Sequence, residues 1–267
     1  MAAPTNHAVA GSTLVYHPDP SVPAAYFEGT LLVLPSPNGI AYLGSLAIDL
    51  LIATEECGFH RTGFFSCPFI EALVAVNVYK NNACLHTAFE VYQNSARTIT
   101  LLQLRSHVLA GFGIQFVSAL MAWIEMQRFK SMVLATGLDQ SRRSDVQLQT
   151  HPFRVYSPVI SPSNIVKIES TNIKILEPYT NEFAVHKSHL PPGAGLTRFI
   201  LDWISANHEF NVNFLALSWF TADGGIAIVC LTLDNYEIAH RLADYLALFV
   251  GLGTVGWNAP VSWDALV

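Results

Sequence analysis

The feature that most constrains the fold is an alternation of short apolar runs with apolar residues at helical spacing. Residues 30–34 (TLLVL) form a continuous run, typical of a strand covered on both faces. The next segment carries a stripe that predicts a helix packed on a sheet: Leu43, Leu46, Ala47, Leu50 and Leu51. Strand-like runs follow at 62–65, 73–79, 85–92 and 98–104, then an almost wholly apolar helix within 110–129 and a strand at 132–136. This order predicts an α/β fold layered around a central sheet.

The second half of the chain opens with a change in composition. Ser, Asn and Lys become denser over 140–189, and four prolines are expected to interrupt regular structure there: Pro152, Pro158, Pro162 and Pro178. This indicates an irregular insertion near 140–190 rather than a second domain. Beyond it we expect a helix at 196–204, strands at 214–220 and 226–231, and a helix from Asp234 that ends at Gly251. The predicted organisation is an irregular N-terminal arm over 1–28 and a single α/β domain over 29–267.

The charge content narrows the function classes. Charged residues make up 13% of the 267 residues, against about 25% in an ordinary soluble domain. With 14 basic and 20 acidic side chains the net charge is −6, which argues against nucleic-acid binding. No membrane span is expected, because the best uncharged candidate, 107–124, is shorter than the roughly 20 residues that a bilayer requires. The shortage of charge instead favours an apolar surface covered by a partner protein.

Motifs that would carry catalysis or cofactor binding are weak or missing in the sequence. There is no GxxxxGK[ST] loop, no GxSxG elbow and no HxxxH pair, and residues 251–256 match GxGxxG only after a helix, where a turn is favoured. The glycines at 193 and 195 could present amides to an anion, although a plain turn into the next helix is favoured. Four cysteines without a CxxC pair favour reduced thiols in the cytosol or nucleus over disulfides or zinc. No catalytic, cofactor-binding or metal-binding residue is therefore predicted.

A few charged residues stand alone in apolar surroundings. Asp49 could act as a general base, but a structural role as a hydrogen-bond acceptor is favoured. Arg105, at the end of a strand-like run, is expected to pair with a carboxylate or to cap carbonyls. Asp145 and Arg154 flank a turn-like segment, where a structural ion pair is the simplest interpretation.

Several segments, taken in order, resemble the proteasome assembly chaperone 2 family. The first is residues 32–35 and 44–51, which include Gly44 and Asp49, and the second is residues 102–106, which include Arg105. The third is residues 145–148 and 152–154, which include Asp145, Gln147, Pro152, Phe153 and Arg154. The last two are residues 192–197, which include Gly193 and Gly195, and residues 260–263, which include Trp263. Together they cover about residues 30–263. The chain departs from the family at Ala41-Tyr42, where members usually have a Gly-Asn pair.

The resemblance implies both a fold and a role. The fold is a three-layer α/β/α sandwich with a central mixed sheet, related to nucleoside-phosphorylase-like folds but without an active site. The role is a non-catalytic chaperone of 20S proteasome assembly in the cytoplasm and nucleus. It implies a heterodimer with proteasome assembly chaperone 1 that binds the α-subunits, promotes α-ring formation and blocks premature or off-pathway ring contacts. No cofactor is expected.

Candidate partner contacts follow from these expectations. Phe112 and Phe116 lie on the apolar helix within 110–129, which could serve as core and as heterodimer contact. Leu266 and Val267 end the chain, where family members can carry a docking tail with a penultimate Tyr that this chain lacks. Two alternatives remain: a generic adaptor, and a small-molecule (nucleoside-type) enzyme or binding protein on the same scaffold. A pocket near Asp49 and Gly193–Gly195 with convergent donors would favour the second.

Overall fold

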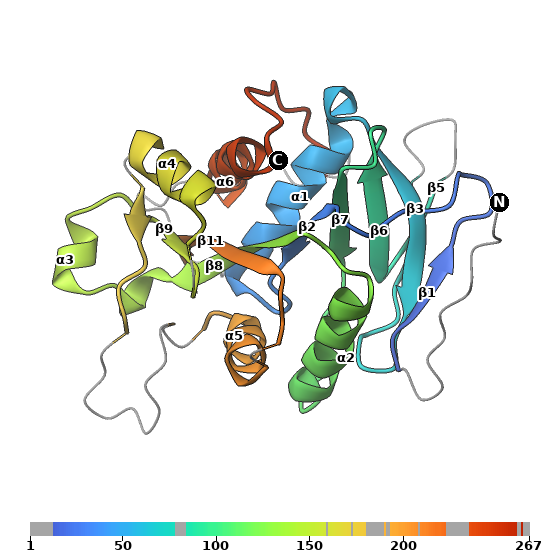
Figure 1. Ribbon diagram of the computed structural model, residues 1–267, viewed down its shortest axis with the longest axis horizontal. Coiled ribbons are helices and arrows are strands. Elements are labelled where there is room, and N and C mark those ends of the chain that lie inside the picture. Colours follow the sequence, from blue (N-terminus) through green and yellow to red (C-terminus); the bar gives the residue numbers. More distant parts are fainter. Residues whose placement is uncertain are drawn as a thin grey trace.

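A computed structural model describes residues 13–77, 84–158, 160–171, 173–179, 190, 193–207, 209–222, 235–260 and 263. Within these residues, nine strands form one mixed sheet in the order β1-β3-β6-β7-β2-β8-β11-β9-β10, and β4 and β5 form a separate two-stranded ribbon (Figure 1). The strands are β1 Val15–Pro18, β2 Leu31–Pro35, β3 Phe59–Ser66, β4 Val74–Asn77, β5 Cys84–Thr87, β6 Phe89–Asn94, β7 Ile99–Leu104, β8 Ser131–Asp139, β9 Phe153–Tyr156, β10 Lys174–Ile175 and β11 Asn213–Thr221. The helices are α1 Leu43–Ala53, α2 Gly113–Met126, α3 Asp145–Leu148, α4 Pro162–Thr171, α5 Thr197–Ala206 and α6 Asn235–Val250.

Helices cover both faces of the sheet, so the three-layer α/β/α sandwich is confirmed. One core contains the inner faces of α1 and α6 with part of α4, and the other contains those of α2 and α5 (Figure 1). The central strands β2, β7 and β8 are parallel to one another and almost fully buried, as their continuous apolar sequences predict. The nucleoside-phosphorylase-like relationship stays a prediction.

The predicted order of strands and helices is largely found, with one division. The run at 85–92 forms two strands that part at Ala88, because β5 pairs with β4 whereas β6 pairs with β3 and β7. The expected strand at 226–231 lies outside the described residues, as does Asp234.

Two segments are more regular than the sequence indicated. Part of the N-terminal arm forms β1, which pairs antiparallel with β3 and ends at Pro18, as suits an edge strand. The described part of 140–190 contains α3, β9, α4 and β10, and β9 extends the main sheet beside β11. Two of its prolines fall at element boundaries: Pro152 immediately precedes β9, and Pro162 is the first residue of α4, where a missing N–H costs no helical hydrogen bond.

The connections around β2 create a switch point at the carboxyl ends of the central strands. After β2 the chain crosses one face of the sheet through α1, whereas after the neighbouring parallel strand β7 it crosses the opposite face through α2. In open α/β sheets, ligands bind outside the carboxyl ends of the strands at such a point. This edge of the sheet is therefore where a site is to be sought.

Candidate functional site

Among the described residues, a cluster of charged side chains is centred on Glu90. This carboxylate on β6 is fully buried and accepts hydrogen bonds from Arg105 Nε at 2.7 Å, Tyr92 Oη at 3.0 Å and the Thr87 amide at 3.1 Å. Arg105 also reaches Asp49 on α1, with Nη1 2.8 Å from Oδ1. The predicted pairing of Arg105 with a carboxylate is thus confirmed, and Asp49 is held in a structural ion pair.

The partners of Glu90 determine its ionisation. Burial alone would raise its pKa, but the hydrogen bond from His86 and the charge of Arg105 outweigh burial and lower the pKa to about 2. Burial and the Glu90 carboxylate raise the pKa of Tyr92. A carboxylate with a pKa this far below neutral is a weak base, and its oxygens already accept hydrogen bonds, so the geometry favours a structural role for the cluster.

A second structural centre holds the segment 144–156. The Arg154 side chain is fully buried; it donates to Thr150 Oγ1 at 2.7 Å and to the Phe153 carbonyl at 2.9 Å, and its Nε lies 3.0 Å from Glu177 Oε2. Gln147 donates to the same Glu177 oxygen at 2.9 Å and closes a capping box with Ser144 at the start of α3.

The expected Asp145–Arg154 pair is not formed. Asp145 lies exposed in the first turn of α3, and Glu177 is the carboxylate that pairs with Arg154. Phe153 is buried in the core, where its ring stacks on Tyr245 with centroids 4.0 Å apart, and Pro152 immediately precedes β9. These family-motif residues therefore build the fold.

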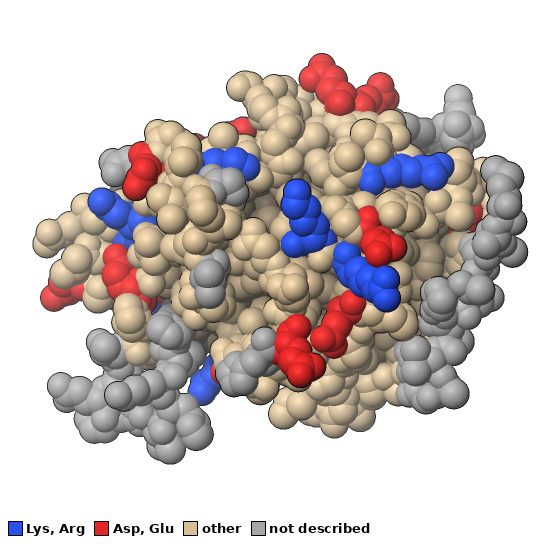
Figure 2. All heavy atoms as spheres, in the orientation of Figure 1, with Lys and Arg blue, Asp and Glu red and all other residues tan. Residues whose placement is uncertain are grey.

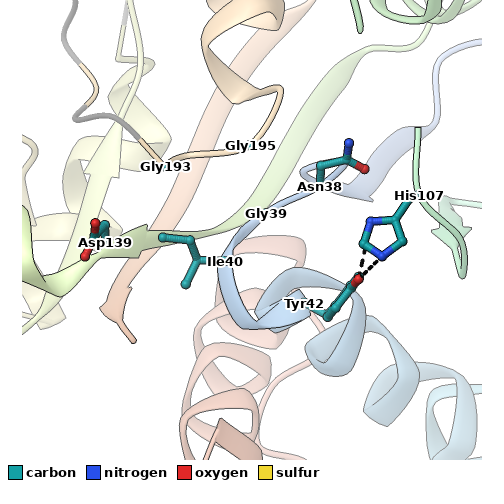
Figure 3. Close-up of a pocket in the computed structure, with 8 residues that line it drawn as sticks. All are labelled: Asn38, Gly39, Ile40, Tyr42, His107, Asp139, Gly193 and Gly195. Carbon is teal, nitrogen blue, oxygen red and sulfur yellow. Dashed lines mark hydrogen bonds between the residues drawn. The ribbon is translucent and has the colours of Figure 1, made fainter. Parts of the chain in front are cut away.

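A pocket of about 560 Å³ lies at the switch point (Figure 3). Its described lining residues come from the loops after β2 and β7, the end of β8 and the turn before α5: Asn38, Gly39, Ile40, Tyr42, His107, Asp139, Gly193 and Gly195. Gly195 has φ +58, and a Cβ there would lie 2.5 Å from the Pro37 carbonyl oxygen, so this close turn requires glycine. The prediction that the 193–195 loop turns into a helix is confirmed, since α5 begins at Thr197.

The polar side chains among the described lining residues are engaged within the chain. The Asn38 amide exchanges two hydrogen bonds with the backbone of Val108, at 2.9 and 3.0 Å. The Tyr42 hydroxyl bonds the His107 ring (Figure 3). Asp139 Oδ1 accepts hydrogen bonds from the amide and the hydroxyl of Ser141. The eight described lining residues include no Ser, Cys, Lys or Arg, and Asp49 is not among them. The side chains of this described lining therefore supply no convergent free donors of the kind that would favour a small-molecule site.

Most exposed apolar side chains of the described surface fall into three sets, and Tyr26, Tyr42 and Met126 are exposed apart from these. One group lies where α2 and α5 begin and includes Phe112, Ile114 and Phe199; the others are Val74, Val76 and Leu85 on the β4–β5 ribbon, and Val146, Leu148, Ile165, Val166 and Ile175 on α3, α4 and β10. Charged side chains form small separate groups on a mostly uncharged face (Figure 2). Such patches are typical of protein-binding surfaces.

The predicted contact residues differ in their exposure to solvent and in whether the structure describes them. Phe112 is 42% exposed and available to a partner. Phe116, one turn later, is fully buried in the core beside Phe89, because its position on α2 faces the sheet. Leu266 and Val267 lie outside the described residues, whereas Trp263 packs against Tyr236 on α6.

Glu90 and Glu177, which hold the two ion-pair clusters together, were not predicted from the sequence. Glu90 carried a signal, since a charge within a strand-like run indicates a paired buried carboxylate. No local sequence pattern indicated Glu177, because its partner Arg154 lies 23 residues earlier in the chain. No group of three or more His, Cys, Asp or Glu among the described residues is arranged to hold a metal ion. None of the described helices is long and apolar enough to cross a membrane.

Comparisons with known proteins agree with this fold. Proteasome assembly chaperone 2 from Bos taurus is 26% identical over 260 residues, covering 89% of this chain and 91% of the relative. The crystal structure of Pyrococcus furiosus PbaA, an archaeal homolog of proteasome-assembly chaperone, matches with a TM-score of 0.57 at 11% identity over 87% of this chain and 86% of that one. Pyrococcus furiosus PbaB, an archaeal proteasome activator, matches with a TM-score of 0.58 at 11% identity over 92% and 91% of the two chains.

The family model matches more than half of the chain. It covers residues 34–188, which contain the Glu90 cluster, the Arg154 centre and the loops after β2 and β7. The chain belongs to the PAC2 family.

Proposed function

We propose that this protein is a proteasome assembly chaperone that acts without catalysis. The observation that supports it most directly is the similarity to a curated proteasome assembly chaperone 2 along about nine tenths of both chains. The site geometry is compatible, because the family-motif residues Asp49, Arg105 and Arg154 are engaged in ion pairs that support the fold. Such residues position a surface and do not react with a substrate.

The proposed mechanism is the burial of apolar surface. The chain pairs with proteasome assembly chaperone 1, and the heterodimer binds α-subunits of the 20S particle, promotes ring formation and blocks off-pathway ring contacts in the cytoplasm and nucleus. The low charge content and the exposed apolar groups support this part of the proposal. A protein–protein interface of standard size buries roughly 1,600 Å² in total, enough to cover one of these exposed apolar groups and the polar residues around it.

Co-expression tests the proposal. The chain is produced with the proteasome assembly chaperone 1 of the same organism, with and without 20S α-subunits, and the products are measured by native mass spectrometry. We expect a one-to-one heterodimer and, with α-subunits present, larger species that contain both chaperones. A chain that stays monomeric with both partners present would overturn the proposal.

A further inference from the structure

The loop between β2 and α1, which lines the pocket at the switch point, has a strained backbone. Asn38, Ala41 and Tyr42 have φ of +53°, +55° and +51°, in the left-handed region. Asparagine adopts this region readily, whereas alanine and tyrosine adopt it at an energetic cost. A Gly-Asn pair at positions 41 and 42 would carry little of that cost. Backbone strain that a fold maintains is concentrated at functional sites, so the pocket is a candidate for binding.

The strained backbone places an aromatic side chain beside this pocket. The Tyr42 side chain is 46% exposed, so burial in the core does not explain its position. Its hydroxyl bonds the His107 ring, and the two rings meet edge to face with centroids 5.2 Å apart (Figure 3). Tyr42 and His107 together form an aromatic wall at one end of the pocket.

The opposite end of the pocket carries a carboxylate (Figure 3). Asp139 is the only Asp, Glu, Lys or Arg among the eight described lining residues. Its Oδ1 accepts from Ser141, whereas Oδ2 lies 3.8 Å from Arg142 Nε in a pair whose side chains are 30% and 50% exposed. Such an exposed pair is weak, so another cation can share or replace it. The space beside Asp139 is open because Gly193 has no side chain; a Cβ there would lie 3.3 Å from the Asp139 Cβ.

The chemistry of the lining indicates which group fits between these two ends. Its side chains supply no convergent free donors, so a ligand must bring its own. A phosphate or a carboxylate would meet the negative charge of Asp139, whereas an ammonium or guanidinium group would donate to it. Ile40 lies between the carboxylate and the aromatic wall and offers an apolar surface to the stem of such a cation (Figure 3). Lysine and arginine side chains have this combination of a charged head and an apolar stem.

The openness of the pocket favours a protein over a small molecule as the source of this side chain. Asn38, Tyr42, His107 and Gly193 are exposed to solvent, whereas small-molecule sites bury roughly 70–90% of their ligand. Glu71 is also exposed near the aromatic wall, since its amide donates to the His107 carbonyl at 2.9 Å. This second acidic residue, on a chain with a net charge of −6, attracts a basic segment.

We propose that the pocket binds a lysine or arginine side chain presented by an extended segment of a partner protein. The charged head lies against Asp139, the stem crosses Ile40, and a neighbouring apolar residue of the segment contacts the wall of Tyr42 and His107. This inference goes beyond the proposed function, because it assigns a binding site and the chemistry that the site recognises.

The test uses short peptides and the full-length chain. Acetyl-Leu-Lys-Leu-amide is the probe, and the same peptide with norleucine in place of lysine lacks only the charge. Binding is measured by isothermal titration calorimetry at low ionic strength, where charge pairs are least screened. Asp139→Asn removes the charge of the pocket but keeps an acceptor oxygen for Ser141. Asp145→Asn is the matched control, because it removes one carboxylate from an exposed position outside the described lining.

We expect the lysine peptide to bind the wild type at least about tenfold more tightly than the norleucine peptide. Asp139→Asn should abolish this preference, and Asp145→Asn should retain it. Equal binding of the two peptides by the wild type, or an unchanged preference in Asp139→Asn, would overturn the proposal. Binding of n-butylamine as tightly as the lysine peptide would overturn the assignment to a protein segment.

Tyr42→Asn tests the aromatic wall. It should weaken binding of the lysine peptide severalfold without lowering the midpoint of thermal unfolding, because asparagine adopts the left-handed region at less cost than tyrosine. Lower stability with unchanged binding would show that the ring supports the fold instead of the pocket. All of these outcomes leave the proposed function standing, since co-expression with the partner chaperone tests it separately.

Discussion

The Nε atom of Arg105 lies 2.7 Å from Oε2 of Glu90 and joins the residue after β7 to a fully buried carboxylate on β6. The same guanidinium holds Asp49 on α1, so one side chain links two neighbouring strands to a helix that covers them. Asp49, Glu90 and Arg105 are thereby fixed to one another at the edge of the sheet where the loops of the pocket begin. Arg105 therefore stabilises the packing of β6, β7 and α1 at that edge.

Replacing Arg105 by Ala should strongly destabilise the fold. It would leave Glu90 buried with its main counter-ion removed, and breaking a buried ion pair in this way costs about 3–5 kcal/mol. The free energy of unfolding, measured by urea denaturation, is the readout. The matched control is Arg241→Ala, which breaks an exposed pair on α6 and should cost about 0–1 kcal/mol. Equal losses in the two variants would contradict the structural role of Arg105.

Glu90 should also make stability depend on pH in the acid range. Its pKa is lowered from 4.5 to about 2 in the fold, so the ionised form contributes stability that is fully present above about pH 4.5. That contribution is lost as the pH falls towards 2, because the unfolded chain takes up a proton that native Glu90 does not bind.

The variant Glu90→Gln isolates this effect. At neutral pH it should be less stable than the wild type, and the difference should narrow steadily between pH 4.5 and 2. The measurement is the free energy of unfolding of both proteins across that range. A difference that stays constant with pH would show that the ionised carboxylate is not what stabilises the fold.

Local periodicity was sufficient to predict most of the layered architecture. The stripe from Leu43 to Leu51 predicted α1, and the continuous runs predicted the buried strands β2, β7 and β8, because covering both faces of a strand requires apolar residues throughout. The segment 140–190 was less predictable, because a high density of prolines suggests irregular structure, whereas Pro152 and Pro162 lie at the boundaries of β9 and α4. The pairing of β9 with β11 depends on residues about 60 positions apart, which no local pattern reveals.

The candidate site was only partly predictable for the same reason. The sequence indicated that Arg105 needs a carboxylate, but Glu90 and Asp49 became its partners through strand pairing and helix packing. The sequence indicated Gly193 and Gly195 as possible lining of a pocket, but the pocket combines loops from four parts of the chain, and the other lining residues had no local signal. Phe116 is buried because its position within α2 faces the sheet, whereas Phe112 is the N-cap residue just before α2 and stays 42% exposed. Only the packed structure shows which side of the helix faces the sheet.

Gly44 should be irreplaceable at the start of α1. A Cβ there would lie 2.3 Å from the Ala135 carbonyl oxygen and 3.2 Å from Cα of Pro35, both backbone atoms that cannot move aside locally. Gly44→Ala should therefore destabilise the fold by about 1–3 kcal/mol, although alanine favours a helix by about 1 kcal/mol over glycine.

Gly113→Ala is the matched control for Gly44→Ala. Gly113 also begins a helix, but the nearest atom to its Cβ is the end of the Leu196 side chain at 2.9 Å, which can rotate. We expect a near-neutral change in the free energy of unfolding. If Gly44→Ala were as mild as Gly113→Ala, the close contact of α1 with β8 would be wrong.

Arg154 should tolerate even lysine poorly. Its Nε, Nη1 and Nη2 each bond a different group, among them the Glu177 carboxylate and Thr150 Oγ1, and a lysine ammonium is a single point that cannot reach them all. Arg154→Lys should cost about 2–4 kcal/mol, because it leaves buried acceptors without donors. Glu177→Gln should cost less, since the Glu177 side chain is 43% exposed and glutamine keeps one acceptor oxygen for Arg154 and Gln147.

Urea denaturation of both variants measures the order of the two losses in the free energy of unfolding. Hydrogen exchange of the β9 amides locates the loss: we expect faster exchange at 153–156 in Arg154→Lys than in Glu177→Gln. The reverse order would mean that Glu177, and not the buried guanidinium, holds the segment 144–156 against the sheet.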